Sequence, residues 1–102
     1  MNHKYRMKPL VIEAFQMTQE RRADNTDWPD WLNQAWQKNH TEIGSLTPAG
    51  YPCSDGTDQL LIHTVAGFHD VVGWDDWIIR DVTGEFRLCK PDIFAATFEE
   101  VR

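Results

Sequence analysis

The sequence predicts an α+β fold: a twisted, mostly antiparallel sheet, arranged as a meander or partial barrel, packs against one Trp-rich helix, and a short helix follows near the C-terminus. Two observations predict this fold class. Short runs of β-branched and aromatic residues, bounded by Gly, Pro, Asn and Asp, recur along the chain. Only residues 29–38 combine several aromatic side chains with helical spacing. The 102 residues, 41% of them hydrophobic, have room for one core, so we expect a single domain over residues 1–102.

The N-terminal third is predicted to hold a strand, a connection and the main helix. Residues 8–16 form the strand, because their β-branched and aromatic side chains partly alternate. Residues 18–26 are polar and lack a hydrophobic period, so we expect an exposed connection. Residues 29–38 form the helix, since Pro suits the first helical position and makes Trp28 the cap, while Asn39 ends it in a left-handed conformation. The face expected to pack on the sheet comprises Trp31, Leu32, Ala35 and Trp36.

The middle of the chain is predicted to contain a weak strand and a long loop. Residues 41–47 have a weak strand pattern, and residues 48–56 are dominated by turn formers. A loop of this size is either a plain connector or a contact surface. Its candidates for surface contact are Tyr51, Cys53, Ser54 and Asp55.

Residues 59–65 and 68–72 are predicted to form a hairpin around the two-residue turn Ala66-Gly67. The register that follows from this turn places His63 opposite Asp70 and puts His63 and His69 on different faces. The histidines are therefore not expected to converge on a metal. Apolar side chains on both faces predict a pair of strands that is buried on both sides or curls into a partial barrel.

A second hairpin is predicted from residues 77–82 and 85–89, with the turn at Thr83-Gly84. Residues 91–97 are expected to form the short C-terminal helix, because Pro91 suits its start and Asp92 its first turn. Residues 98–101 are expected to close the sheet as an edge strand.

Charge and cysteine content exclude several classes of function. Ten Lys and Arg stand against sixteen Asp and Glu, a net charge of -6, which argues against nucleic acid as a partner. No apolar run approaches the roughly 20 residues that span a bilayer, so we expect a cytoplasmic protein that does not bind membranes. Cys53 and Cys89 are far apart, which predicts reduced thiols and no zinc site. No motif for a cofactor is present.

Residues 76–99 resemble the C-terminal signature of a family of small proteins encoded by phages and prophages, roughly Gly-Asp-Trp-Ile-Ile-Arg-Gly-Val-x-Gly-Glu-Phe-x-x-Cys-Lys-Pro-Asp-Ile-Phe. The resemblance extends to residues 8–16 and 28–32. This sequence departs from the family pattern at residues 73–77, where a Pro-Gly-Asp-Trp turn is usual, and at Asp81, where Gly is common. The resemblance implies a phage or prophage accessory protein in a bacterial host cell, and it implies no particular reaction.

The densest set of ionisable side chains lies in and around that signature. Paired carboxylates beside a cation serve either as structural ion pairs or as an acid and a base with separated pKa values. Cys89 next to Lys90 is either an ordinary half-buried thiol or a reactive one. Trp28 is the tryptophan least tied to the packed helix face. The candidate ligand or partner contacts are Trp28, Asp76, Trp77, Arg80, Glu85, Cys89, Lys90 and Asp92.

Three functions remain open from the sequence. The first is non-catalytic binding of a host protein or a small ligand, with the aromatic side chains used mainly for the core. The second is a small-molecule-binding or hydrolytic protein that uses Asp76, Arg80, Glu85, Lys90 and Asp92. The third is a minor virion or assembly component. Exposed sheet edges and the aromatic surplus also favour a homodimer.

Overall fold

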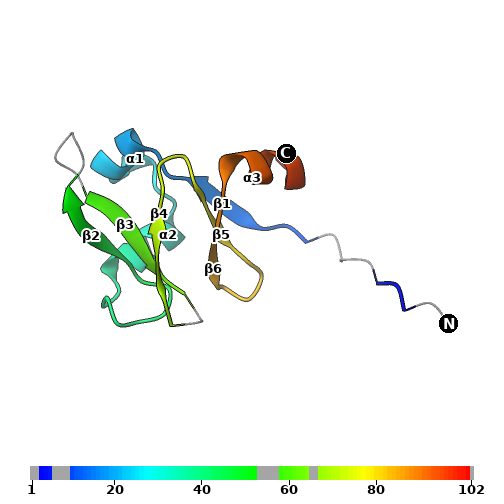
Figure 1. The fold of residues 1–102 in the computed structure, drawn as a ribbon, viewed down its shortest axis with the longest axis horizontal. Coiled ribbons are helices and arrows are strands. Elements are labelled where there is room, and N and C mark those ends of the chain that lie inside the picture. Colours follow the sequence, from blue (N-terminus) through cyan, green and yellow to red (C-terminus); the bar gives the residue numbers. More distant parts are fainter. Residues whose placement is uncertain (1–2, 6–9, 53–57, 65–66, 102) are drawn as a thin grey trace.

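The computed structural model describes residues 3–5, 10–52, 58–64 and 67–101. It contains two antiparallel three-stranded sheets, with strand orders β1-β5-β6 and β2-β3-β4, together with helices. Figure 1 shows the β2-β3-β4 sheet on the left and the β1-β5-β6 sheet on the right. The α+β class is confirmed; the described residues form two sheets in place of one, and they do not close a barrel. The elements are β1 (Glu13–Gln16), α1 (Gln19–Ala23), the 3-10 helix η1 (Asn25–Asp27), α2 (Asp30–Gln37), β2 (Leu46–Pro52), β3 (Asp58–His63), β4 (His69–Val72), β5 (Trp77–Arg80), β6 (Phe86–Cys89) and α3 (Pro91–Thr97).

The predicted main helix is confirmed as α2, and both sheets share one core with it. Leu32 and Ala35 of α2 are buried, as expected, while Trp31 and Trp36 are partly buried against the same cluster. The remaining buried core side chains are Met17, Trp28, Leu46, Leu60, Ile62, Val72, Ile78 and Phe86. Because members of this cluster come from β2, β3, β4, β5 and β6, the two sheets cannot unfold independently without exposing it.

Both ends of α2 differ from expectation. Pro29 occupies the cap position, so Trp28 lies one residue before it. Lys38 ends the helix in an extended conformation, and the only described non-glycine residue with positive φ is Asp75, so the left-handed role predicted for Asn39 is wrong. The Asn39 side chain instead accepts a hydrogen bond from the Thr41 backbone N–H at 3.0 Å, an alternative that short polar side chains offer the backbone.

The connection predicted over residues 18–26 has no buried residue, as expected of an exposed segment, but it is not irregular, because it forms α1 and the start of η1. Thr18 caps α1 by accepting the Arg21 N–H at 3.1 Å, and Asp24 caps η1 by accepting the Thr26 N–H at 3.0 Å. Arg21 also donates to the Gln16 carbonyl at 2.7 Å and lies over the Phe15 ring. The segment has no hydrophobic face, so capping and these contacts stabilise it instead.

The extent of the second strand differs from the prediction. β2 covers residues 46–52, so the strand starts later than the predicted 41–47 and occupies half of the predicted loop 48–56. Pro48 and Pro52 are tolerated because β2 is an edge strand with an irregular register between them. Tyr51 lies in β2, while the predicted contacts Cys53, Ser54 and Asp55 fall outside the described residues.

The first predicted hairpin forms, but its register is wrong by one residue. His63 pairs with His69, and Ile62 pairs with Asp70. The Thr64 N–H donates to the Phe68 carbonyl at 2.8 Å, and Gly67 has a φ of +89°. Three residues, 65–67, therefore connect Thr64 to Phe68, instead of the predicted two. The two histidine rings consequently lie on the same face, stacked with centroids 4.3 Å apart.

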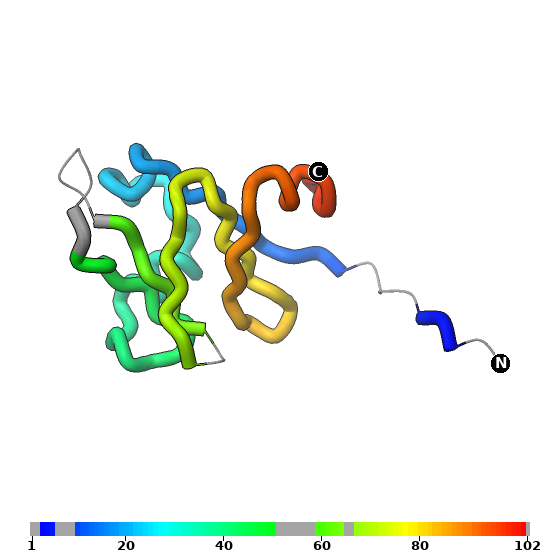
Figure 2. Tube along the Cα trace, in the orientation of Figure 1, coloured from blue at the N-terminus to red at the C-terminus, as the bar shows by residue number. Residues whose placement is uncertain are grey.

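The C-terminal hairpin and helix are confirmed. Trp77 pairs with Cys89 and Arg80 with Phe86, and α3 begins at Pro91. Residues 98–101, expected as an edge strand, are not one in the described structure. Phe98 continues from α3 by donating its N–H to the Phe94 carbonyl and packs on the Phe94 ring, so this segment folds beside α3 rather than along a sheet edge (Figure 2).

Candidate functional site

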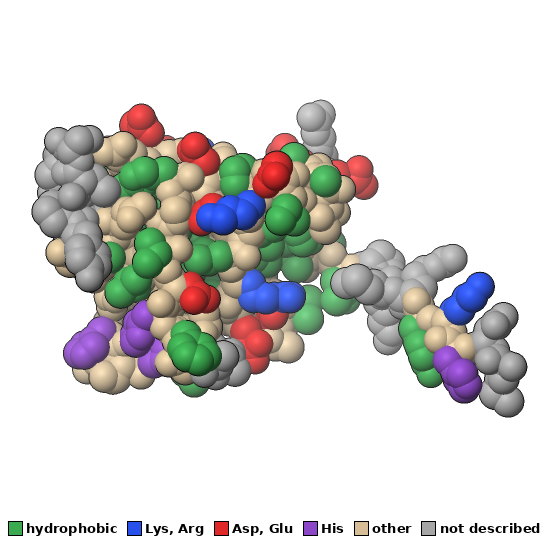
Figure 3. Space-filling view, in the orientation of Figure 1, with side chains coloured by type: hydrophobic (Ala, Val, Ile, Leu, Met, Phe, Trp, Pro, Cys, Tyr) green, Lys and Arg blue, Asp and Glu red, His purple; other side chains and the backbone are tan. Residues whose placement is uncertain are grey.

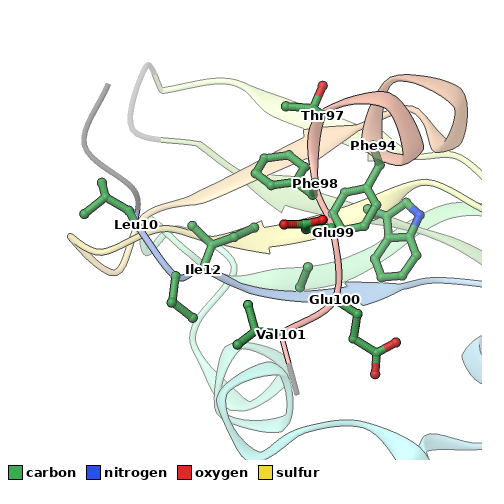
Figure 4. A pocket seen from close by; sticks show the side chains of 11 residues that line it. Leu10, Ile12, Phe94, Thr97, Phe98, Glu99, Glu100 and Val101 are labelled. Carbon is green, nitrogen blue, oxygen red and sulfur yellow. The ribbon is translucent and has the colours of Figure 1, made fainter. Parts of the chain in front are cut away.

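One concave site is a groove of about 770 Å³ with a mainly apolar lining. Three separate parts of the chain build it: the segment that leads into β1, the start of β5, and the end of α3 with the residues that follow it. We call it the apolar groove. It is lined by Leu10, Val11, Ile12, Ala14, Trp77, Phe94, Thr97, Phe98, Glu99, Glu100 and Val101 (Figure 4).

Aromatic stacking fixes the wall of the apolar groove. The Trp77 and Phe94 rings are nearly parallel, at 5° and with centroids 3.9 Å apart, and Phe98 packs on Phe94 at 4.9 Å. Trp77 is held in place by its pairing with Gln16 of β1 on one side and Cys89 of β6 on the other. An offset or parallel stack of this kind adds about 0.5–1.5 kcal/mol beyond area burial. The wall is therefore anchored to the β1-β5-β6 sheet.

The opposite side and the rim of the groove are apolar and open to solvent. Leu10 is 56% exposed, Val11 70% and Val101 71%. In Figure 4, Phe94 and Phe98 lie on one side and Leu10 and Ile12 on another, with Glu100 extending away from them. Glu99 and Glu100 add two carboxylates to a lining that otherwise carries no charge. The groove therefore combines exposed apolar side chains with two carboxylates.

A second, smaller site is a depression of about 340 Å³ next to the Asp76–Lys90 ion pair. The Asp76 carboxylate is 3% exposed and accepts the Gly73 N–H at 2.9 Å. Lys90 reaches both carboxylate oxygens at 3.2 Å from the solvent side. Cys89 lines the same depression, where its Sγ donates to the Lys90 carbonyl at 3.6 Å. The acceptor sites of Asp76 are thus engaged by partners within the chain.

The structure brings together only some of the residues that the sequence singled out. Asp76, Cys89 and Lys90 surround the depression, and Trp77 lines the apolar groove. Arg80 donates to Glu13 of the neighbouring strand at 3.0 Å, Glu85 is exposed near the turn, and Asp92 accepts the Ile93 N–H at 2.9 Å.

Trp28 belongs to the core instead of the surface. It is 6% exposed, its Nε1 donates to the Arg21 carbonyl at 2.7 Å, and it meets Trp36 edge-on at 5.9 Å. Trp77, which the sequence also singled out as a contact, is half-buried and lines the apolar groove.

Most residues of the apolar groove were missed from the sequence. Leu10, Val11 and Ile12 match a strand pattern, and residues 98–101 match a closing edge strand. One sequence feature could have indicated the groove: apolar side chains lie on both sides of Glu99 and Glu100. A solvent-exposed strand at the edge of a sheet does not require apolar side chains at these positions.

The stacked histidines form a third cluster. His69 Nε2 lies 3.2 Å from the His40 carbonyl, while the buried Nδ1 of His63 has no hydrogen-bond partner among the described residues. The described part of the chain holds no group of three or more His, Cys, Asp or Glu side chains placed for a metal ion.

Two aspartates, the exposed Asp24 and the half-buried Asp81, have lowered pKa values. The Thr83 hydroxyl, at 2.5 Å, is the main cause of the lowered pKa of Asp81, and Arg87 at 3.7 Å acts in the same direction. The Thr26 side chain is the main cause of the lowered pKa of Asp24. Both carboxylates stabilise local turns, and neither lines the apolar groove or the depression.

Comparison with known proteins gives no relative: no family model, no curated protein and no solved structure matches the chain. Among the helices that the structure describes, none has the length and apolar character needed to cross a membrane.

Proposed function

We propose that this protein is a non-catalytic accessory protein of a phage or prophage that acts in the bacterial cytoplasm by binding a host protein in the apolar groove. The phage origin rests on the resemblance of residues 76–99 to the phage and prophage signature. The binding role rests on the groove itself.

The observation that carries the proposal is an open apolar rim on a rigid aromatic wall. Leu10, Val11 and Val101 expose more than half of their surface beside the stacked Trp77 and Phe94 rings. Sites for small molecules enclose about 70–90% of the ligand. An open groove suits an elongated segment of a protein better, with apolar side chains as anchors.

The charge of the groove indicates which segments fit. Glu99 and Glu100 are its only charged lining residues, and the whole chain carries a net charge of -6. A partner segment with apolar side chains next to Lys or Arg gains contact area and avoids charge repulsion. Acidic segments are disfavoured for the same reason.

The ionisable cluster supports binding over catalysis. Asp76 already accepts hydrogen bonds from Gly73 and Lys90, and Arg80 is paired with Glu13. A general acid or base has to reach a substrate proton. Asp76 and Lys90 are instead engaged with each other and Arg80 with Glu13, as structural ion pairs are.

The test is affinity capture from host lysate with the full chain and two groove variants, Val11→Glu and Val101→Glu. Both side chains are at least 70% exposed, so the fold should survive the change. Val82→Glu, at a position 62% exposed and outside the groove lining, is the matched control.

The expected result is one host protein recovered with the unmodified chain and the control, and reduced at least about tenfold with either groove variant, which is about 1.4 kcal/mol of binding free energy. Equal recovery with the groove variants would refute the groove as the binding site. A small molecule found in the bound fraction by mass spectrometry, without any protein, would refute a protein partner.

A further inference from the structure

The unpaired edge of β1 runs along the apolar groove. β1 is an outer strand of the β1-β5-β6 sheet, so only the edge that faces β5 is paired. Figure 1 shows the chain before β1 continuing the line of this strand. Four residues of this stretch line the groove: Leu10, Val11, Ile12 and Ala14. Because successive side chains of an extended chain point to opposite sides, a groove that both Val11 and Ile12 line reaches around the edge of the strand.

Half of the backbone groups of β1 face this free edge. Opposite residues of an antiparallel pair alternate between positions that exchange hydrogen bonds and positions that do not. The Met17 N–H bonds to the Asp76 carbonyl at 2.9 Å. Counting back from that bond along the register, the N–H and C=O groups of Gln16 and Ala14 point away from β5. The Gln16 carbonyl agrees with this direction, since it accepts a hydrogen bond from the Arg21 side chain at 2.7 Å.

The described chain provides no strand partner for the outward groups of residues 10–14. Among the described residues, this stretch makes no backbone hydrogen bond except to β5. Residues 98–101 line the same groove, but the Phe98 N–H bonds to the Phe94 carbonyl, and the described residues after it make no backbone hydrogen bond to this stretch. A strand edge with free N–H and C=O groups is a template for pairing with another chain.

The other outer strands of the two described sheets carry features that discourage such pairing. β2 contains two prolines and a shift of register. β4 begins with the exposed His69 and Asp70, and β6 exposes Arg87. Proline, irregular register and charged side chains are the usual protection of a sheet edge. Residues 10–14 contain no proline and a single charged residue, Glu13, so this edge is the least protected of the four.

The surface along this edge is apolar and acidic. Leu10 and Val11 are exposed, and Figure 3 shows hydrophobic side chains at the surface where the segment before β1 leaves the fold. The charged side chains of the groove lining are the carboxylates of Glu99 and Glu100. Lys or Arg placed among apolar side chains complements this surface, whereas a carboxylate is repelled by it.

We propose that the protein binds an extended segment of its partner, rich in apolar and basic residues, as a fourth strand added to the free edge of β1. The inference rests on the proposed function and adds the form of the partner. Backbone hydrogen bonds to Ala14 and to residues 10–12 supply affinity, alternate apolar side chains enter the groove, and Glu99 and Glu100 select for cations. A helical segment is excluded from this edge, because its own backbone groups are already paired.

The probe is a synthetic peptide of about nine residues in which Val and Lys alternate, a length typical of strands. It is titrated into the full chain by calorimetry. Two further peptides carry N-methyl groups, one on every Val and the other on every Lys. Since the N–H groups of a strand alternate in direction, only one of these two sets can face β1. A fourth peptide of the same composition has its Val residues at helical spacing.

Strand addition predicts that one N-methylated peptide binds at least about tenfold more weakly than the other, because only one loses hydrogen bonds to β1. The peptide with helical spacing should bind more weakly than the alternating one. In the chain, amide hydrogen exchange at Ile12 and Ala14 should slow when the alternating peptide is bound, as NMR measures.

A substitution in the chain removes the same hydrogen bond from the other side. Ala14→Pro deletes an outward N–H, which an edge strand tolerates, and should weaken peptide binding at least about tenfold. Ala14→Val, with a side chain of similar size and an intact N–H, is the matched control and should bind nearly as well as the unmodified chain. Should Ala14→Pro fail to fold, the two N-methylated peptides still decide the question.

Failure of strand addition can be told apart from failure of the proposed function. Absence of binding by the alternating peptide, equal binding of the two N-methylated peptides, or unchanged exchange at Ala14 would overturn strand addition. If one of these results appears while Val101→Glu still loses a captured host protein, the proposed function stands without strand addition. If the N-methylated peptides differ as expected but no host protein is captured from lysate, strand addition stands and the proposed function is wrong.

Discussion

Replacing Asp76 by Ala should destabilise the fold much more than replacing its partner Lys90 by Met. The two residues form one ion pair, with 3.2 Å between Lys90 Nζ and each carboxylate oxygen, but their environments differ. The Asp76 side chain is 4% exposed, whereas that of Lys90 is 66% exposed. Asp76 additionally accepts the Gly73 N–H at 2.9 Å, a bond that Lys90 does not share.

The expected loss of unfolding free energy follows from two contributions, the hydrogen bond from Gly73 and the ion pair with Lys90. A hydrogen bond to a charged group contributes about 1.5–3 kcal/mol, and an ion pair with an exposed partner only about 0–1 kcal/mol after solvent screening. Asp76→Ala loses both, so the free energy of unfolding should fall by about 2–3 kcal/mol. In Lys90→Met the carboxylate lies beside an open depression, where water replaces the ammonium group. That variant should lose about 1 kcal/mol or less.

Urea denaturation followed by tryptophan fluorescence measures both values. By thermal unfolding, Asp76→Ala should lower Tm by roughly 10–20 °C, as a loss of 2–3 kcal/mol implies for a domain of this size. The double variant gives the coupling between the two residues, which should be about 1 kcal/mol or less. Equal destabilisation by both single variants would show that the ion pair, and not the Gly73 hydrogen bond, is the main contribution, and the argument from exposure would be wrong.

Three further outcomes are expected. Leu32→Ala should lower the free energy of unfolding by about 2–5 kcal/mol, because Leu32 is fully buried beneath α2, whereas the exposed Gln34→Ala should change it by less than about 0.5 kcal/mol in the same urea series. Gly73→Ala should destabilise by about 1–3 kcal/mol, since the added Cβ would lie 2.9 Å from Asp76 Oδ2, and this cost should shrink in the Asp76→Ala background. The lowered pKa of Asp81 stabilises the folded state above the ordinary Asp pKa, and this contribution is lost as the pH falls through the lowered value; an NMR titration should show it, and Thr83→Ala should raise that pKa.

The first hairpin shows what a sequence pattern leaves open. The positions of β3 and β4 were predictable from their apolar residues and the turn between them, but the register depends on whether two or three residues form that turn. Ala66-Gly67 suits a two-residue turn, while the hydrogen bond from Thr64 to the Phe68 carbonyl selects three. This one-residue difference changes which side chains share a face. In the observed register the His63 and His69 rings stack on one face, whereas the predicted register placed them on different faces.

Local capping explains two other differences. Residues 19–23 have no apolar period, so periodicity could not predict α1, and no residue of α1 is buried. The helix is instead defined by Thr18 at its start and by Arg21, which bonds to the Gln16 carbonyl. β2 was underestimated because Pro48 and Pro52 suggest a loop, although an edge strand tolerates both. Sequence patterns report burial better than they report hydrogen bonds of this kind.

The apolar groove was unpredictable for a different reason, because its two sides come from opposite ends of the chain. Residues 10–12 are an apolar run that favours a strand, and residues 98–101 were expected to close the sheet as an edge strand. A sequence pattern cannot distinguish a side chain that faces a core from one that faces an open groove. The structure distinguishes them through α3: Phe94 stacks on Trp77 and Phe98 packs on Phe94, so residues 98–101 line the groove together with residues 10–12 and form no strand. Phe94→Ala should therefore disorder residues 98–101 and abolish binding at the groove while the core around Leu32 remains folded. Loss of global stability equal to that of Leu32→Ala would show that the Trp77–Phe94 stack belongs to the core, and the groove would then be a by-product of packing instead of a binding site.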